Sequence, residues 1–337
     1  MIAGAQFEID TDPASVQLIA PLETLERFEG VSFSSTGDVL AVATSENNTV
    51  LLFRRKLDGR FEEQPYCTIG GANSRLAYPH DISFSTCGKL LAVAQRRGAI
   101  AIYQKSREGE GYGPEPVFEI SGRKSKLALS DGVAFVPPHD RYVAACNLQL
   151  GTIAFYRRIS SNPLRFKTRP EFELRHPSLQ EPDGLAFSSD GKWLATANHG
   201  NHSVCVFQRQ NRFLSAGRLR YWREPVSVIK DPQMRYPHSV AFAPRSNHLV
   251  VTNAGANYFS AYQPSTRQSR TRWSEPAVLQ QMVNNEAAFM EVNCRNKMEG
   301  GPKGIAVHDR TLAVCSPEFG IKIYSFRDRP GGVADAG

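Results

Sequence analysis

An ionisable residue opens each of six short motifs that recur along the chain. After it comes a short apolar stretch that ends near Phe, as in Glu29-Gly-Val-Ser-Phe33 and His80-Asp-Ile-Ser-Phe84. The six ionisable positions are Glu29, His80, Asp131, Asp183, His238 and Lys303. If the fold brings these positions together, their carboxylates, imidazoles and amine could bind a cation, transfer protons or polarise a carbonyl group.

The motif recurs at an even spacing. Its last position falls at residues 33, 84, 135, 187, 242 and 307, a period of roughly 50 residues that lies in the range of propeller repeats. Each copy contains short apolar segments that alternate with polar residues and are bounded by turn residues, as antiparallel strands do. The sequence therefore predicts an all-β fold, a six-bladed β-propeller of four-stranded antiparallel blades.

The two ends of the chain complement each other. The sixth copy ends with Ile321–Phe326 and lacks a fourth strand, whereas Ser15–Ile19 is a spare strand before the first copy. Pairing the two segments would close the ring and cover an exposed sheet edge. We therefore expect one domain over residues 1–337, with a flexible tail at 328–337.

One long insertion interrupts the repeat in the fifth blade. Residues 264–288 contain the basic run Arg267–Arg272, then Trp273, and a candidate helix over Pro276–Phe289. Counting strand directions places the insertion on the face away from the six ionisable residues. We expect it to contact a protein partner and to contribute nothing to chemistry.

Closing the ring would place the six ionisable residues at one mouth of the central channel, where the second strand of each blade also ends. We expect His80, His238, Asp131 and Lys303 to be catalytic. A further set of polar side chains would bind a small anionic molecule there: Asn147, Asn198, His199, Asn253, Arg96, Arg75 and Arg235. Hydrolysis of an ester or lactone is the simplest reaction for such a set.

Three carboxylates in one narrow mouth repel one another and need compensation by a cation, shared protons or neighbouring positive groups. Lys303 and the imidazoles could compensate them internally. A divalent cation is the alternative, with Glu29, Asp183 and Asp131 as the expected ligands. Oxygen ligands alone suit Ca²⁺ or Mg²⁺, whereas adding His80 and His238 suits Zn²⁺, Mn²⁺ or Fe²⁺.

The same residues also have a purely structural interpretation. An Asp before Gly commonly forms a turn or caps local backbone N–H groups, and a His after Pro could be a buried imidazole that bonds a neighbouring blade. The ring is then an internal salt-bridge network, and the protein is a non-catalytic scaffold that holds a protein or peptide on its rims. Fold alone does not choose between scaffold and enzyme.

The composition of the chain limits which binding partners and which cellular compartment we expect. The chain has 40 Lys and Arg against 33 Asp and Glu, but the excess is spread over hairpins without a nucleic-acid-binding signature, so a nucleic acid is not an expected partner. Six scattered cysteines without a CxxC pair indicate a reducing compartment. Neither a signal peptide nor a membrane-spanning run is visible. We expect a cytoplasmic protein without membrane contact.

Two segments resemble a known type of repeat. Leu194–Phe207 and Leu249–Tyr262, which follow Pro-Asp-Gly and Pro-His-Ser motifs, look like the repeats of lactonase-type β-propellers, including 6-phosphogluconolactonase-like and YVTN-repeat proteins. Those proteins usually have seven blades. Six blades with acidic opening residues look more like the gluconolactonase and regucalcin group. That resemblance implies a divalent cation held by Glu, Asn and Asp side chains, with Glu29 and Asp183 as the corresponding residues.

Overall fold

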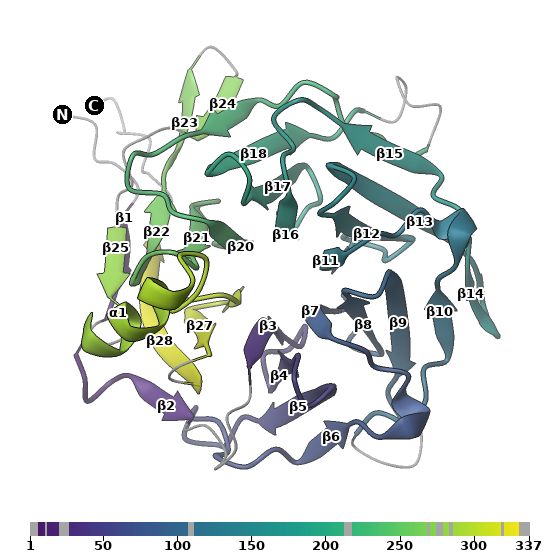
Figure 1. The fold of residues 1–337 in the computed structure, drawn as a ribbon, viewed down its shortest axis with the longest axis horizontal. Helices are drawn as coiled ribbons and strands as arrows, with labels where there is room; N and C mark the ends of the chain where they lie inside the picture. The colour runs from purple at the N-terminus through teal and green to yellow at the C-terminus, as the bar shows by residue number, and fades with distance from the viewer. Residues whose placement is uncertain are drawn as a thin grey trace, which may run out of the picture.

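The computed structural model describes residues 6–10, 12–19, 27–106, 111–211, 218–267, 270–273, 279–282, 286–317 and 320–329. These residues form six antiparallel blades around a central axis, which confirms the predicted six-bladed β-propeller (Figure 1). The tail expected at 328–337 begins inside the last strand, and residues 330–337 lie outside the described part of the chain. No helix in the described part is long and apolar enough to cross a membrane.

Strands pair in sequence order within a blade, with the first strand nearest the axis. Blade 1 consists of β3 (Phe28–Phe33), β4 (Val39–Thr44), β5 (Thr49–Arg54) and β6 (Cys67–Ile69). Blade 2 consists of β7 (Pro79–Phe84), β8 (Leu90–Gln95), β9 (Ala99–Gln104) and β10 (Phe118–Ile120). Short 3-10 helices precede the second and third blades, at Ala72–Ser74 and Arg123–Ser125.

Blade 3 has an extended third strand. It consists of β11 (Ser130–Phe135), β12 (Tyr142–Asn147), β13 (Thr152–Ser161), β14 (Leu164–Phe166) and β15 (Phe172–Arg175). The first half of β13 pairs with β15, and its second half forms a hairpin with β14. Blade 4 is regular, with β16 (Pro182–Phe187), β17 (Trp193–Asn198), β18 (Ser203–Gln208) and β19 (Ser227–Ile229).

The insertion expected at 264–288 divides into several elements of blade 5. That blade contains β20 (Pro237–Phe242), β21 (Leu249–Asn253), β22 (Tyr258–Tyr262) and β25 (Leu279–Met282). Between β22 and β25 lies the hairpin of β23 (Pro264–Arg267) and β24 (Arg270–Trp273). Trp273 Nε1 donates to Asn247 O at 2.8 Å, in the turn between β20 and β21.

The candidate helix over Pro276–Phe289 is shifted in the structure. Leu279–Met282 is a strand because it pairs with β22 and completes the blade. The helix α1 (Glu286–Arg295) begins after this strand, in the connection to blade 6 (Figure 1). Its Glu286 accepts a hydrogen bond from Asn257 at 3.3 Å, in the turn after β21. The helix therefore lies on the face where the second strands end, opposite to the β23–β24 hairpin.

The N-terminus closes the ring. Blade 6 contains β26 (Ile305–His308), β27 (Thr311–Ser316) and β28 (Gly320–Arg329). β2 (Gln17–Ile19) pairs antiparallel with β28 through Leu18 and Lys322, as the two incomplete ends predict. A second strand, β1 (Gln6–Ile9), pairs with the far end of β28 and was not expected from the sequence.

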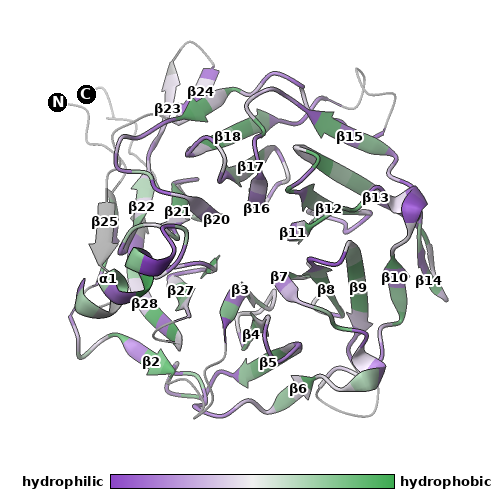
Figure 2. Cartoon of the chain, viewed as in Figure 1, coloured by the Kyte–Doolittle hydropathy of each residue, from purple (hydrophilic) through white to green (hydrophobic). Residues whose placement is uncertain are grey.

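Apolar side chains fill the layers between neighbouring blades. Leu52 of blade 1 and Val93 of blade 2, both fully buried, belong to one such layer, and equivalent clusters separate the other blades. The second and third strands of most blades are accordingly hydrophobic in Figure 2, whereas β16 at the axis is hydrophilic. The polar residues thus gather where the inner strands meet.

Candidate axial site

A β-bulge lies at the ionisable residue of five of the six inner strands and directs its side chain toward the axis. In β3 the pairing register shifts between Phe28 and Val31, on either side of Glu29, and β7, β11, β16 and β20 shift at the same position. A bulge leaves one residue outside the regular ladder and redirects its side chain. Lys303 occupies the same position just before β26. The repeated motif therefore encodes a repeated bulge.

Glycine follows several of the ionisable residues because adjacent inner strands nearly touch there. A Cβ on Gly132 would lie 2.3 Å from the carbonyl oxygen of Asp183, and one on Gly184 would lie 2.6 Å from that of His238. Neither glycine has a positive φ, so close approach accounts for it and a turn does not. The Asp-Gly pairs are parts of the blade-to-blade contact.

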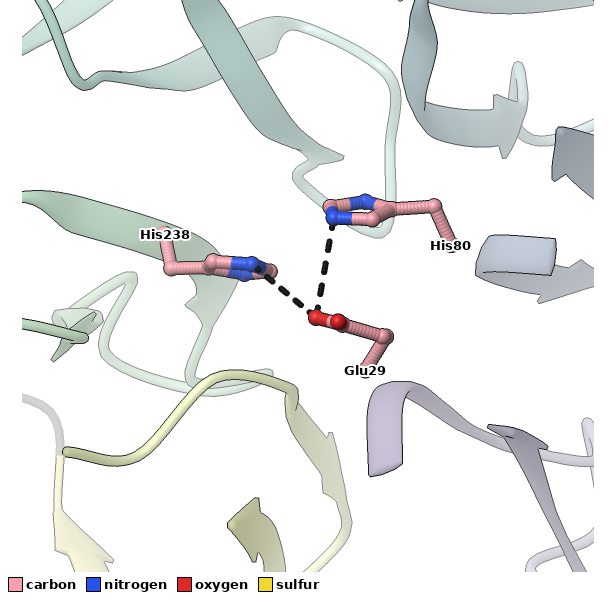
Figure 3. Close-up of side chains that lie close together, drawn as sticks. All are labelled: Glu29, His80 and His238. Atoms are coloured by element: carbon pink, nitrogen blue, oxygen red, sulfur yellow. Dashed lines mark ion pairs between the residues drawn. The ribbon is translucent and has the colours of Figure 1, made fainter. Parts of the chain in front are cut away.

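Glu29, His80 and His238 meet on the axis from three different blades (Figure 3). Glu29 Oε2 lies 3.6 Å from His80 Nε2 and 3.4 Å from His238 Nε2. The two imidazole rings stack with their centroids 5.0 Å apart. All three residues are buried, so their charge states depend on one another.

Asp131 and Asp183 complete the cluster on the other side of His80. His80 Nδ1 lies 3.7 Å from Asp183 Oδ1 and 4.0 Å from Asp131 Oδ1. His199, which sequence analysis assigned to substrate binding, joins the cluster with its Nε2 atom 3.4 Å from Asp183 Oδ2. Asp131, Asp183 and His199 are buried as well.

Basic residues compensate these carboxylates. Lys303 Nζ lies 3.1 Å from Glu29 Oε2 and 2.8 Å from Glu299 Oε2, although the lysine side chain is only 2% exposed. Arg27 Nε donates to Glu29 Oε1 at 2.6 Å and also pairs with Glu299. Arg96 Nε donates to Asp131 Oδ1 at 3.1 Å. The structure thus contains the internal salt-bridge network that the structural interpretation describes.

Glu299 could not have been found from the repeat. It follows α1 in the connection between blades 5 and 6, which has no counterpart in the other blades. Asp81 was missed for a different reason, because it stands where four other copies have Gly after the ionisable residue. Its Oδ2 accepts a hydrogen bond from Val133 N of the next blade at 2.9 Å. It therefore links two inner strands.

The surroundings of Glu29, His80 and His238 shift their pKa values and so set which of these residues are charged at neutral pH. Burial disfavours the charged form of Glu29, but Lys303, His80 and His238 outweigh burial and hold its pKa well below the usual range. Burial lowers the pKa of His80, and Arg96 lowers it further. Burial likewise lowers the pKa of His238. The imidazoles are therefore neutral beside an ionised glutamate.

The two aspartates shift in the opposite direction. Burial raises the pKa of Asp131 to about 6, although the Arg96 guanidinium opposes the rise. Burial and then the neighbouring Asp131 raise the pKa of Asp183 well above its usual value. A proton retained on Asp183 reduces the repulsion between the two carboxyl groups.

The amides expected to bind substrate are engaged with the backbone. Asn147 Oδ1 accepts from Ala128 N at 3.3 Å, and Asn253 Oδ1 accepts from Arg235 N at 3.1 Å. Asn198 Nδ2 donates to Ser203 O at 3.3 Å. These side-chain to backbone hydrogen bonds stabilise the loops around the ends of the second strands.

The arginines expected to clamp an anion do not converge. Arg75 is exposed, in a left-handed conformation after a 3-10 helix. Arg235 Nη1 donates to Pro232 O at 2.6 Å and so folds back on its own loop. Only Arg96 of the three reaches the axial cluster, where its Nη2 lies 3.0 Å from His80 Nε2.

Side chains leave almost no free space at the mouth. The cavity bounded by Glu29, His80, Asp183 and His238 has a volume of about 10 Å³, barely enough for one water molecule. A larger cavity of about 210 Å³ lies deeper, between the middle portions of all six inner strands. Its walls include Ser32, Ser83 and Ala134, and Asp81 provides a carboxylate.

Two groups in the described part of the chain have the spacing of metal ligands. Glu29, His80 and His238 form one, and His80, Asp131 and Asp183 form the other, each with ligand atoms within 4.8 Å of one another. The carboxylates of Glu29, Asp131 and Asp183, expected as ligands, are thus divided between two groups. Any ion here would have imidazole as well as oxygen ligands.

A second concavity lies on the opposite face, between blades 3 and 4. This groove has a volume of about 1070 Å³ and follows the turn after β11, the end of β13 and the end of β18. Six basic residues line it: Arg141, Arg157, Arg158, Lys167, Arg209 and Arg218. Two acidic residues, Glu171 and Asp190, accompany them among the described residues of the lining. We call this feature the basic groove.

Comparisons with known proteins agree on the fold. A model of the WD40 family (WD domain, G-beta repeat) matches residues 180–208, the first three strands of blade 4. Sequence comparison with curated proteins gives no match. Among solved structures, a chain of the mitotic checkpoint complex aligns with a TM-score of 0.56 and 14% identity over 95% of this chain and 81% of that chain.

Two further solved structures with a similar fold belong to different kinds of protein, one a putative enzyme and one a set of WD40 repeats. A putative 6-phosphogluconolactonase from Bacteroides uniformis ATCC 8492 aligns with a TM-score of 0.59 and 13% identity, over 88% of this chain and 82% of that chain. The RRP9 WD40 repeats align with a TM-score of 0.59 and 10% identity, over 96% and 100%. Likeness at these identities shows a shared propeller fold and does not single out lactonases.

Proposed function

We propose that the protein is a propeller scaffold that binds an acidic segment of a partner protein in the basic groove. The size and charge of the groove carry this proposal. Its volume of about 1070 Å³ lies just above the roughly 300–1,000 Å³ typical of ligand pockets. A short extended peptide would fit, and six basic against two acidic residues select for negative charge.

The acidic residues of the groove do little to offset its positive charge. Glu171 accepts from Lys167 Nζ at 2.7 Å and from Tyr142 OH at 2.7 Å, and it pairs with Arg157 Nε at 2.8 Å. One carboxylate is therefore shared between two cations. Arg141 and Arg218 are exposed at the rim, where a partner carboxylate can reach them.

A peptide suits the groove better than a nucleic acid does. Ile159, on the extended strand β13, is 54% exposed and lines the groove beside Arg158, which offers an apolar contact within the positive field. The aromatic side chain of the lining, Tyr142, is buried. Single-stranded nucleic acids bind by stacking bases on exposed aromatic rings, and the described residues of the lining offer none.

The enzyme alternative has less support. It would use His80, His238, Asp131 and Lys303 as catalytic groups and hydrolyse a lactone or ester at the axial mouth. The cavity there is about 10 Å³, and Lys303 is engaged with two carboxylates. A substrate would have to displace the salt-bridge network. The solved structure from an assembled checkpoint complex and the WD40 match also favour a scaffold.

Binding of a labelled Glu-rich peptide to the full-length protein tests the proposal. We expect a saturable rise in fluorescence anisotropy that weakens with added salt, and no rise with a Lys-rich peptide of equal length. The double variant R141E/R218E should weaken binding at least about tenfold. The control R123E/K124E changes the net charge equally on exposed residues away from the groove and should bind as the parent does.

Three outcomes would overturn the proposal. The Glu-rich peptide fails to bind, or both double variants weaken it equally, which would show attraction to overall charge only. In the third, a single-stranded oligonucleotide binds more tightly than the peptide and loses affinity in R141E/R218E, which would identify a nucleic-acid surface.

A further inference from the structure

We propose that Glu29, His80 and His238 form a binding site for one divalent transition-metal ion on the propeller axis. Each of the three residues offers one ligand atom within 4.8 Å of the other two. Glu29 Oε2 faces both His80 Nε2 and His238 Nε2 (Figure 3), so we assign these three atoms as the ligands. This inference does not depend on the scaffold function, because the basic groove lies on the opposite face.

Two of the three atoms have no hydrogen-bond partner although they are buried. Glu29 Oε2 and His238 Nε2 are both unsatisfied, in residues that are 1% and 3% exposed. Buried polar atoms of this kind are rare and call for an explanation. Lys303 Nζ forms an ion pair with Oε2 at 3.1 Å, but its hydrogen bond goes to the other oxygen, Oε1, at 3.2 Å. Oε2 can therefore still offer a lone pair to an ion.

The spacing of these atoms fits metal ligands. The separations of 3.4 and 3.6 Å between Glu29 Oε2 and the two imidazole nitrogens are too long for good hydrogen bonds. Ligands about 2.1 Å from a tetrahedral ion are about 3.4 Å apart. An ion between the three atoms would satisfy both orphaned atoms without a large movement.

A neighbouring carbonyl orients the His80 imidazole for this task. His80 Nδ1 faces Asp131 O at 3.4 Å, and a hydrogen bond from Nδ1 leaves the Nε2 lone pair directed toward Glu29. Arg96 Nη2 lies 3.0 Å from that nitrogen. The Arg96 side chain is 39% exposed, so it can turn outward when the ion takes the lone pair.

The donor set selects the class of ion. Two imidazoles and one carboxylate suit Zn²⁺, Mn²⁺ or Fe²⁺, whereas Ca²⁺ and Mg²⁺ prefer oxygen ligands. The remaining cavity of about 10 Å³ holds at most one water as a fourth ligand. The ligands come from blades 1, 2 and 5, so the ion would cross-link the inner strands. We therefore assign it a structural role.

Metal titration of the stripped full-length protein tests the site. After dialysis against chelator, we expect calorimetry with Zn²⁺ to show one equivalent bound, a higher melting temperature, and no comparable effect of Ca²⁺. Co²⁺ in place of Zn²⁺ should give the visible absorption of a coordinated ion. The variants H238Q and E29Q should weaken binding about 10–100-fold, whereas H139A, at an exposed histidine, should not.

Circular dichroism of each variant separates lost binding from lost folding. A variant that is unfolded is replaced by H80Q, which removes a different ligand and should have the same effect on binding. The site is refuted if the parent binds no stoichiometric Zn²⁺ or Co²⁺, or if H238Q and E29Q bind as the parent does. If D131N and D183N lose binding while H238Q and E29Q keep it, the ion is held by His80, Asp131 and Asp183 instead. That result would also refute the proposed site.

Discussion

Lys303 Nζ lies 3.1 Å from Glu29 Oε2, and this buried ion pair joins the last blade of the propeller to the first. The two residues are separated by almost the whole chain, yet they occupy the same position of the repeated motif. The pair forms only when the ring is closed. It therefore acts beside the N-terminal strand as a second connection between the two ends of the propeller.

Removing one partner of this pair should destabilise the protein strongly. In K303M, Glu29 loses one of its two cations and keeps only Arg27, so we expect a loss of up to about 3–5 kcal/mol, the cost of a buried charge left without its partner. The double variant K303M/E29Q removes the charge as well and should recover much of the loss. Urea denaturation of the two single variants and the double variant measures the coupling. Additive effects would show that the pair contributes nothing to ring closure.

Close approach of the inner strands gives a second prediction. A Cβ on Gly184 would lie 2.6 Å from His238 O and 2.7 Å from Ser239 Cα. G184A must push two blades apart, and such overpacking costs about 1–3 kcal/mol. Gly113 has no neighbour within 4 Å of an added Cβ, so G113A should match the parent. Thermal melts of both variants make the comparison, and equal melting temperatures would contradict it.

The architecture was predictable because it is repeated. Six copies of one motif set the blade number, and two incomplete ends set the closure by β2 and β28. Elements outside the repeat were not predictable in the same way. The strand β1 and the position of α1 depend on tertiary pairing, since Leu279–Met282 forms a strand only because β22 offers it an edge.

The sequence was enough to predict which residues meet at the axial site, but not how much space they leave for a ligand. Placing an ionisable residue at one register in every copy was enough to bring Glu29, His80 and His238 together. The free space was not predictable, because it depends on how deeply the side chains interdigitate. Glu299 stayed hidden in a unique connection, yet it completes the charge balance of Lys303.

Asp81 should make the stability of the protein fall as pH rises. Burial, opposed by hydrogen bonds from Val133 N and Ile82 N and aided by the nearby Asp131, raises the pKa of Asp81 to about 7. The native state therefore holds this proton more tightly than the unfolded chain. Its stabilising contribution is full below about pH 4, is lost as pH rises to about 7, and is constant above that.

The variant D81N removes this titration. Relative to the parent, its free energy of unfolding should rise by roughly 2–4 kcal/mol between pH 4 and pH 8, because only the parent must ionise the half-buried carboxyl group. Urea denaturation at several pH values gives the difference curve. The substitution D58N, at an exposed aspartate, provides the control and should not reproduce the D81N curve. A flat curve for D81N would show that Asp81 titrates normally.

Ring closure by the N-terminus depends on a single glutamine as well as on strand pairing. Gln17 Nε2 donates to Phe61 O at 2.7 Å, and Phe61 N donates to Gln17 Oε1 at 2.8 Å. These bonds fasten β2 to blade 1 while its backbone pairs with blade 6. Q17A would leave two buried backbone groups of Phe61 without partners, at a cost of about 2–4 kcal/mol.

Leu18, the neighbour of Gln17, provides the control. Its side chain is 47% exposed, so L18A should cost less than about 0.5 kcal/mol. Urea denaturation and limited proteolysis near the N-terminus compare the two. Equal stability of the variants would show that backbone pairing with β28 closes the ring without the glutamine.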